Sequence, residues 1–240
     1  MRTLLMTALL SLTSTAALAQ FHFAGYTHRG NGCPQNTVSF VEAPDGKSVS
    51  VLYDNFNVQL PDPLAGQVAG STLRRRYDPR RNNKACNISF NVQLEAGQSV
   101  EALKITVYNR GAAILDQGVT ANLSTRFLGY QAFRARGAPQ SVMIEDRTWR
   151  GEANEDWLSN PVVNLPIRSG CASGAERGVR FDMMTALDAQ ITNGNLSASA
   201  LVTMDSSDVN AGMKIRVITR ACGGRMAPEL APVRHERRPR

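Results

Sequence analysis

The sequence is poor in the side chains on which many catalytic sites depend. Its 240 residues include three histidines, His22, His28 and His235. Nucleophilic triads and histidine metal sites need positioned imidazoles, and we expect these three to lie in terminal segments outside the strands. The G-x-S-x-G elbow, the P-loop, the dinucleotide-binding glycine pattern and the H-E-x-x-H motif are also missing. We therefore expect a protein with no enzymatic activity, no bound metal and no cofactor.

The sequence also lacks any run of 18 apolar residues, about the length that a helix needs to cross a bilayer. Its first residues have the features of a cleavable export signal: Arg2, a short apolar stretch from Leu4 to Leu18, and small residues at Ala17 and Ala19. We expect residues 1–19 to be a signal peptide and the mature chain to begin at Gln20. The alternative is an N-terminal membrane anchor. We predict a secreted or periplasmic protein.

Cysteines are few, and no two of them stand close enough for a C-x-x-C zinc pair. The chain has four: Cys33, Cys86, Cys171 and Cys222. An even number of cysteines in an exported chain predicts disulfides. Four cysteines allow three pairings, and two similar spacings favour Cys33 with Cys86 and Cys171 with Cys222.

Acidic residues are fewer than basic ones, with 20 Asp and Glu against 27 Lys and Arg, a net charge of +7. The excess lies in two segments that lack strand patterning, residues 61–85 and 223–240. We expect an irregular basic loop and a disordered basic tail. The loop contains the residues that we predict to bind anionic surfaces: Arg74, Arg75, Arg76, Arg80 and Arg81. The alternative is a solvated loop that aids solubility.

The chain is rich in period-2 alternation of apolar and polar residues. Short alternating runs lie within residues 38–42, 49–53, 56–60, 88–94, 103–107, 113–115, 121–130, 196–204 and 213–220. Residues 181–191 fit a helical face and a strand equally well, and Asn193-Gly194, a strong hairpin signal, favours strands there. Short strands separated by Gly, Asn and Asp turns predict an all-β protein. We expect one antiparallel sandwich over residues 20–222, jelly-roll-like or a meander, with disulfides.

Aromatic residues are scarce, and the only two tryptophans flank a polar segment that we expect to be a loop, residues 147–160. Trp149 and Trp157 on such a loop are candidates for contact with a sugar or a partner protein. The alternative is that both cap one end of the sandwich core.

Several segments occur in an order that resembles a known secreted family. They are Gly32-Cys33-Pro34, Tyr53-Asp54-Asn55-Phe56, Lys84-Ala85-Cys86-Asn87-Ile88-Ser89-Phe90, Val107-Tyr108-Asn109-Arg110-Gly111, Asp205-Ser206-Ser207-Asp208 and Arg220-Ala221-Cys222. The family is domain of unknown function 4360, and the resemblance runs from about Gly32 to Cys222. It implies an exported β-rich domain with paired cysteines and implies no reaction. The Arg-rich segment before Cys86 and the basic tail depart from the family pattern.

These observations predict a non-enzymatic binding module that attaches to anionic envelope surfaces through the basic loop and tail. Its expected partner is an anionic polymer or lipid, whereas the export signal makes nucleic acid an unfavoured partner. The alternative is a secreted inhibitor or partner-binding protein that presents a disulfide-braced loop to another exported protein. The dependence of binding on salt concentration distinguishes these two functions, because screening weakens electrostatic attachment and leaves a hydrophobic interface largely intact.

Overall fold

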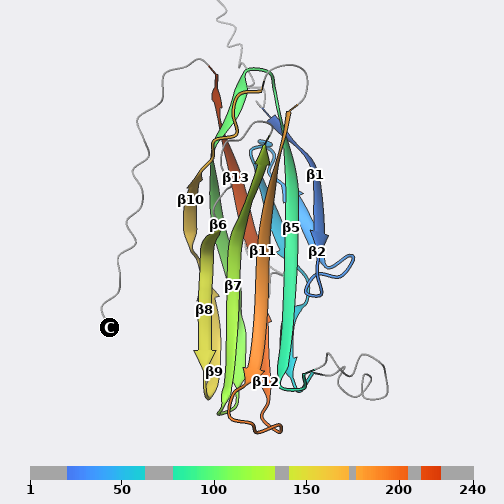
Figure 1. Cartoon of the computed structure of the whole chain (residues 1–240), viewed down its shortest axis with the longest axis vertical. Coiled ribbons are helices and arrows are strands. Elements are labelled where there is room, and N and C mark those ends of the chain that lie inside the picture. Colours follow the sequence, from blue (N-terminus) through green and yellow to red (C-terminus); the bar gives the residue numbers. More distant parts are fainter. Residues whose placement is uncertain (1–20, 63–77, 133–140, 173–176, 205–211, 223–240) are drawn as a thin grey trace, which may run out of the picture.

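The structure is a computed structural model that describes residues 21–62, 78–132, 141–172, 177–204 and 212–222. The predicted signal peptide, the tail 223–240 with His235, and Arg74, Arg75 and Arg76 lie outside these residues. The described chain forms two antiparallel sheets packed face to face in an elongated sandwich (Figure 1). This confirms the predicted fold class. No helix in the described ranges could span a membrane.

The first sheet has five strands, all of which pair with antiparallel neighbours. In spatial order they are β1 (Phe21–Arg29), β5 (Arg81–Leu94), β11 (Arg177–Ile191), β7 (Val119–Ala132) and β8 (Val142–Arg150). The second sheet has eight strands: β2 (Val38–Glu42), β3 (Ser48–Tyr53), β13 (Gly212–Ala221), β6 (Gln98–Leu115), β12 (Ala200–Met204) and β4 (Phe56–Leu60) in order, with β9 (Ala153–Ser159) and β10 (Val162–Pro166) also paired to β6.

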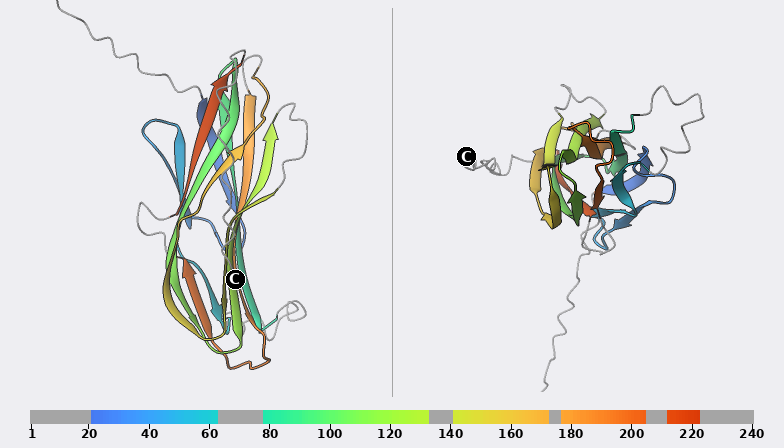
Figure 2. Two further views of the ribbon diagram at one scale, coloured as in Figure 1. Left: turned by 90° about the vertical axis from the view of Figure 1, so that its left-hand side faces the viewer. Right: turned by 90° about the horizontal axis from the view of Figure 1, so that it is seen from below.

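The long strand β6 divides the second sheet into two halves. Its first part, up to Tyr108, pairs with β13 and β10, whereas its second part, from Asn109, pairs with β9 and β12. In Figure 1, β10 and β13 accordingly lie above β9 and β12. The molecule narrows at mid-length in the left view of Figure 2. We call the two parts the upper half and the lower half, and the place where β6 changes partners the waist.

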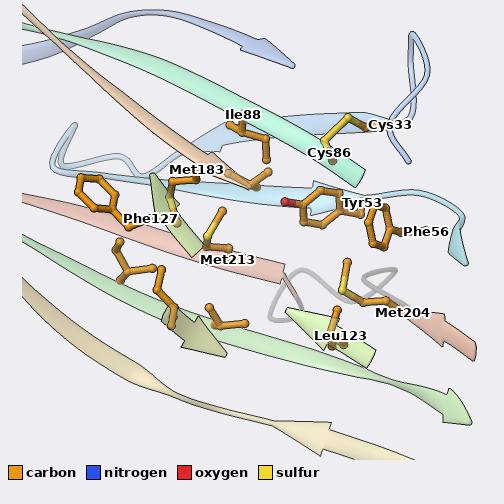
Figure 3. Close-up of a cluster of buried hydrophobic side chains, with 14 of the residues drawn as sticks. Cys33, Tyr53, Phe56, Cys86, Ile88, Leu123, Phe127, Met183, Met204 and Met213 are labelled. Atoms are coloured by element: carbon orange, nitrogen blue, oxygen red, sulfur yellow. A yellow bond between two sulfur atoms is a disulfide. The ribbon is translucent and has the colours of Figure 1, made fainter. Parts of the chain in front are cut away.

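The core fills the space between the sheets along their whole length. Its largest fully buried side chains include Phe56, Phe90, Phe181 and Leu103. The rings of Phe90 and Phe181 stack on neighbouring strands with their centroids 5.0 Å apart. Figure 3 shows how residues distant in sequence, such as Tyr53 and Met213, meet there. Burial of one such side chain contributes roughly 1.5–3 kcal/mol. The inward-facing apolar residues of the alternating strands therefore stabilise the packing of the two sheets against each other.

Both disulfides have the predicted pairing. Cys33 joins Cys86 across 53 residues, and Cys171 joins Cys222 across 51 residues. The first ties the turn after β1 to the middle of β5. The second ties the segment after β10 to the end of β13. No described cysteine is free.

Three local predictions were wrong. Residues 81–85 are not part of an irregular loop, because they begin β5 and pair with Ala186–Gln190 of β11. His22 and His28 lie in β1 rather than outside the strands. Residues 147–160 are not a loop, because they form the end of β8 and all of β9. For residues 81–85 and 147–160, a paired neighbouring strand outweighs a polar local sequence.

The hairpin expected at Asn193-Gly194 is also absent. β11 belongs to the first sheet and β12 to the second, so this segment crosses between the sheets. Asn193 and Asn195 instead use their side-chain oxygens to accept backbone N–H groups two residues later. Such turns satisfy the backbone locally without pairing the flanking strands.

Candidate functional site

The predicted anion-binding arginines are only partly within the described chain. Arg80 is exposed in the turn before β5. Arg81 is already paired: its Nε donates to Asp188 Oδ1 at 2.7 Å across the outer face of the first sheet. Arg81 therefore has less capacity to bind an external anion than Arg80.

Trp149 and Trp157 join the two sheets at the lower end of the molecule. Their ring centroids lie 5.5 Å apart, with Trp149 on β8 of the first sheet and Trp157 on β9 of the second. The Arg147 guanidinium carbon lies 5.2 Å and 5.7 Å from the two ring centroids. Only 5% of Trp149 and 3% of Trp157 is exposed. This burial leaves little indole surface for a ligand and agrees with the alternative that both tryptophans cap the core.

Glu155 completes this cluster. One of its carboxylate oxygens accepts hydrogen bonds from Arg147 Nη2 at 3.0 Å and from Trp149 Nε1 at 2.7 Å. The hydrogen bonds from Arg147 and Trp149 lower the pKa of Glu155. Glu155 thus satisfies the donors of Arg147 and Trp149. The buried indole N–H of Trp157, in contrast, has no hydrogen-bond partner in the described part of the chain.

A second cluster of buried polar side chains lies at the waist, and the sequence did not predict it. Asn109 Nδ2 donates to Glu145 Oε2 at 2.6 Å, and Thr125 Oγ1 donates to the same oxygen at 3.5 Å. Thr185 Oγ1 lies 3.5 Å from the Thr125 hydroxyl and 3.2 Å from that of Tyr53. The group connects strands of both sheets where β6 changes partners.

Burial is the main influence on Glu145. Its side chain is 5% exposed, and desolvation raises its pKa despite opposing hydrogen bonds from Ser159, Asn109 and Thr125. A buried carboxyl with a raised pKa is also found in catalytic acids. Here it is enclosed between the sheets, so that a substrate has no access to it. Among the described residues, no cluster of three His, Cys, Asp or Glu side chains could hold a metal ion.

The strongest candidate for a binding surface is a row of basic side chains on the outer face of the upper half. Lys104 of β6 lies directly opposite Arg216 of β13, and Lys214 of β13 lies opposite Thr106. All three basic side chains are exposed. Tyr108, 39% exposed, follows on the same face of β6 and lies opposite Gly212. We call Lys104, Tyr108, Lys214 and Arg216 the cationic strip.

The three cations of the strip have no ion-pair partner in the described part of the chain. Arg81, Arg147 and Arg180, in contrast, each contact a carboxylate. Neutral residues flank the strip, namely Ser50 of β3 opposite Lys214 and Asn164 of β10 opposite Lys104. Like charges directly opposite one another in a sheet destabilise it. Their unopposed charge therefore favours binding of an anion from outside.

The outer face of the lower half has a different character. An open groove of about 500 Å³ lies there, lined by Arg110, Gly111, Ala112, Asp156, Trp157, Leu158 and Thr203. Apolar side chains are exposed nearby, with 47% of Ile114, 70% of Leu158 and 36% of Leu201 accessible. This half could accommodate an apolar partner, whereas the upper half suits an anionic one.

Residues 19–222 match a family described as a domain of unknown function, DUF4360, and the chain belongs to that family. It is similar to an uncharacterised secreted protein of Arthroderma benhamiae, with 22% identity over 201 residues, which cover 84% of this chain and 71% of the relative. With its two disulfides, the protein is a secreted member of this family.

Two solved structures show weak similarity to the chain. One is TmCBM61 in complex with β-1,4-galactotriose, with 10% identity, a TM-score of 0.25, and coverage of 82% of this chain and 91% of the other. The other is from infectious bursal disease virus strain Gx, with 13% identity, a TM-score of 0.19, and coverage of 95% and 67%. Similarity at this level does not indicate which ligand the protein binds.

Proposed function

We propose that this secreted protein is a non-enzymatic binding module that attaches to anionic polymers of an envelope surface. The observation that carries the proposal is the juxtaposition of Lys104, Lys214 and Arg216 on one rigid face without a carboxylate partner in the described chain.

Placing these positive charges together is unfavourable when no anion is bound. Like charges directly opposite one another on a sheet destabilise it, and Lys104 and Arg216 form such a pair. A bound polyanion removes this repulsion and releases its own condensed counterions, so both effects favour binding. Because the strands hold the backbone of these residues in place, less backbone entropy is lost on binding than with a flexible basic segment.

The basic loop and tail are the second part of the proposal. Arg74, Arg75, Arg76 and Arg80 add avidity as further contacts for a long polymer, and the tail arginines act in the same way. Arg81 adds less, since Asp188 already occupies it.

The test compares two variants that lose the same positive charge. The strip variant carries Lys104→Ser, Lys214→Ser and Arg216→Ser. The control carries Arg29→Ser, Arg126→Ser and Arg150→Ser, which remove three exposed arginines from the first sheet. Binding to polyacrylate, a linear polyanion without sugar rings, is measured between 50 mM and 500 mM salt.

We expect the strip variant to lose at least tenfold in affinity at low salt and the control to lose much less. Wild-type binding should weaken steeply as salt rises. Equal losses in the two variants would mean that net charge alone matters. Wild-type affinity in the strip variant would remove the basis of the proposal.

A partner-binding role is the second candidate, favoured by the exposed Ile114, Leu158 and Leu201 around the lower groove. Apolar contacts at an interface core resist salt. A partner captured from culture medium that stays bound at 1 M salt and is lost in Leu158→Asp would support this role over electrostatic attachment.

A further inference from the structure

The cationic strip has a linear shape, and this shape limits the ligands that fit it. Lys104 and Tyr108 project from the same face of β6, and four residues of strand span about 13 Å. The cations of β13 lie beside one end of this line, with Arg216 opposite Lys104. Neutral Ser50 and Asn164 border it on either side. The surface is therefore a narrow track about one chain wide.

Tyr108 lies within this track rather than beside it. Its cross-strand neighbour is Gly212, so no side chain covers the ring from that strand. Gly212 has a φ of 121°, and an added Cβ would lie 2.3 Å from the Val51 carbonyl oxygen. The backbone therefore disfavours any larger residue at this position. Tyr108 keeps 39% of its surface exposed beside the basic side chains, although the Leu52 side chain of β3 lies next to Gly212.

We propose that the strip binds a single extended chain of an anionic polysaccharide, with one sugar ring stacked on Tyr108 and its acidic groups contacting Lys104, Lys214 and Arg216. This inference rests on the proposed function and names its ligand class. The apolar face of a sugar ring gains from burial against an aromatic face, while the guanidinium of Arg216 has the fork geometry that matches a carboxylate.

A lipid bilayer fits this surface less well. Membrane-binding surfaces combine a broad basic area with apolar side chains that enter the headgroup region. The strip is narrow, and its aromatic ring stands between charges. A flat plane of headgroups would contact the neutral borders as much as the cations.

The experiment compares ligands that share carboxylates and differ in the ring. Polygalacturonate is a linear carboxylated polysaccharide, polyacrylate carries carboxylates without sugar rings, and vesicles containing phosphatidylglycerol present an anionic plane. Affinities are measured by calorimetry and by co-sedimentation for wild type, Tyr108→Ala, Tyr108→Phe, the strip variant and Leu128→Ala. The last variant removes an exposed apolar side chain from β7 of the first sheet.

We expect Tyr108→Ala to weaken polygalacturonate binding about tenfold and to leave polyacrylate binding within twofold. Tyr108→Phe and Leu128→Ala should bind both polymers like wild type. The strip variant should lose both. Unchanged urea midpoints in Tyr108→Ala and Tyr108→Phe would show that the variants remain folded.

Three outcomes would overturn the inference while the proposed function stands. They are equal affinity of wild type for the two polymers, an equal loss on both polymers in Tyr108→Ala, and tighter binding to the vesicles than to polygalacturonate. A different result would refute the proposed function itself: the strip variant would bind polyacrylate with the same affinity as wild type.

Discussion

Glu145 at the waist predicts an unusual dependence of stability on pH. Its pKa in the folded protein is raised from the ordinary value of 4.5, mainly by burial. The folded state therefore holds this proton more tightly than the unfolded state. The contribution of Glu145 to the free energy of unfolding is greatest below pH 4.5 and decreases as pH rises through the folded pKa.

The size of the effect follows from proton linkage. One proton retained by the folded state and released by the unfolded state changes the free energy of unfolding by at most about 1.4 kcal/mol per pH unit. Glu145→Gln keeps the shape and an oxygen that can accept from Asn109, and it does not titrate. The free energy of unfolding of this variant should not show this dependence on pH. At pH 8 the variant should be as stable as wild type or more stable.

The assay is urea unfolding without reductant at intervals from pH 4.5 to pH 8. This range lies above the lowered pKa of Glu155, whose contribution is lost only as pH falls further. The matched control is Glu152→Gln, which changes an exposed carboxyl in the turn between β8 and β9. Parallel profiles for wild type and Glu145→Gln would refute the reasoning, as would a large loss of stability in Glu145→Gln at pH 8.

Two further predictions concern the scaffold that holds the strip. Replacing Cys171 and Cys222 with Ser should lower the free energy of unfolding by about 2–5 kcal/mol, measured by urea unfolding, and an unchanged midpoint would contradict this. Gly111→Ala would place a Cβ 1.8 Å from the Thr203 carbonyl oxygen, so we expect a loss of about 1–3 kcal/mol or more. Gly178→Ala is its control, because a Cβ there meets nothing within 4 Å, and a loss as large in the control would show that the contact with Thr203 is not the cause.

Part of the site could be read from the sequence, and part could not. The two disulfides followed from the export signal and the spacing of the cysteines. The two tryptophans stood out by their scarcity, yet only the structure showed their burial. The local sequence did not indicate that Glu145 is buried, since an inward-facing carboxyl in a strand cannot be told from an exposed one until its neighbours are known. Its partners Asn109 and Thr125 lie on two other strands, and Thr185, whose hydroxyl contacts that of Thr125, lies on a third.

The sequence by itself determined the class of fold, because alternation with a period of two requires a sheet that buries one face. It also determined most strands and the covalent links between them. Only the tertiary structure decided which strands are neighbours. β1 was missed since Gly25 interrupts its alternation with a shift in register. The strip exists only because β13 pairs with β6 in a register that sets Arg216 opposite Lys104, more than 100 residues away. The register of two paired strands depends on how the whole core packs, so the local sequence pattern does not determine it.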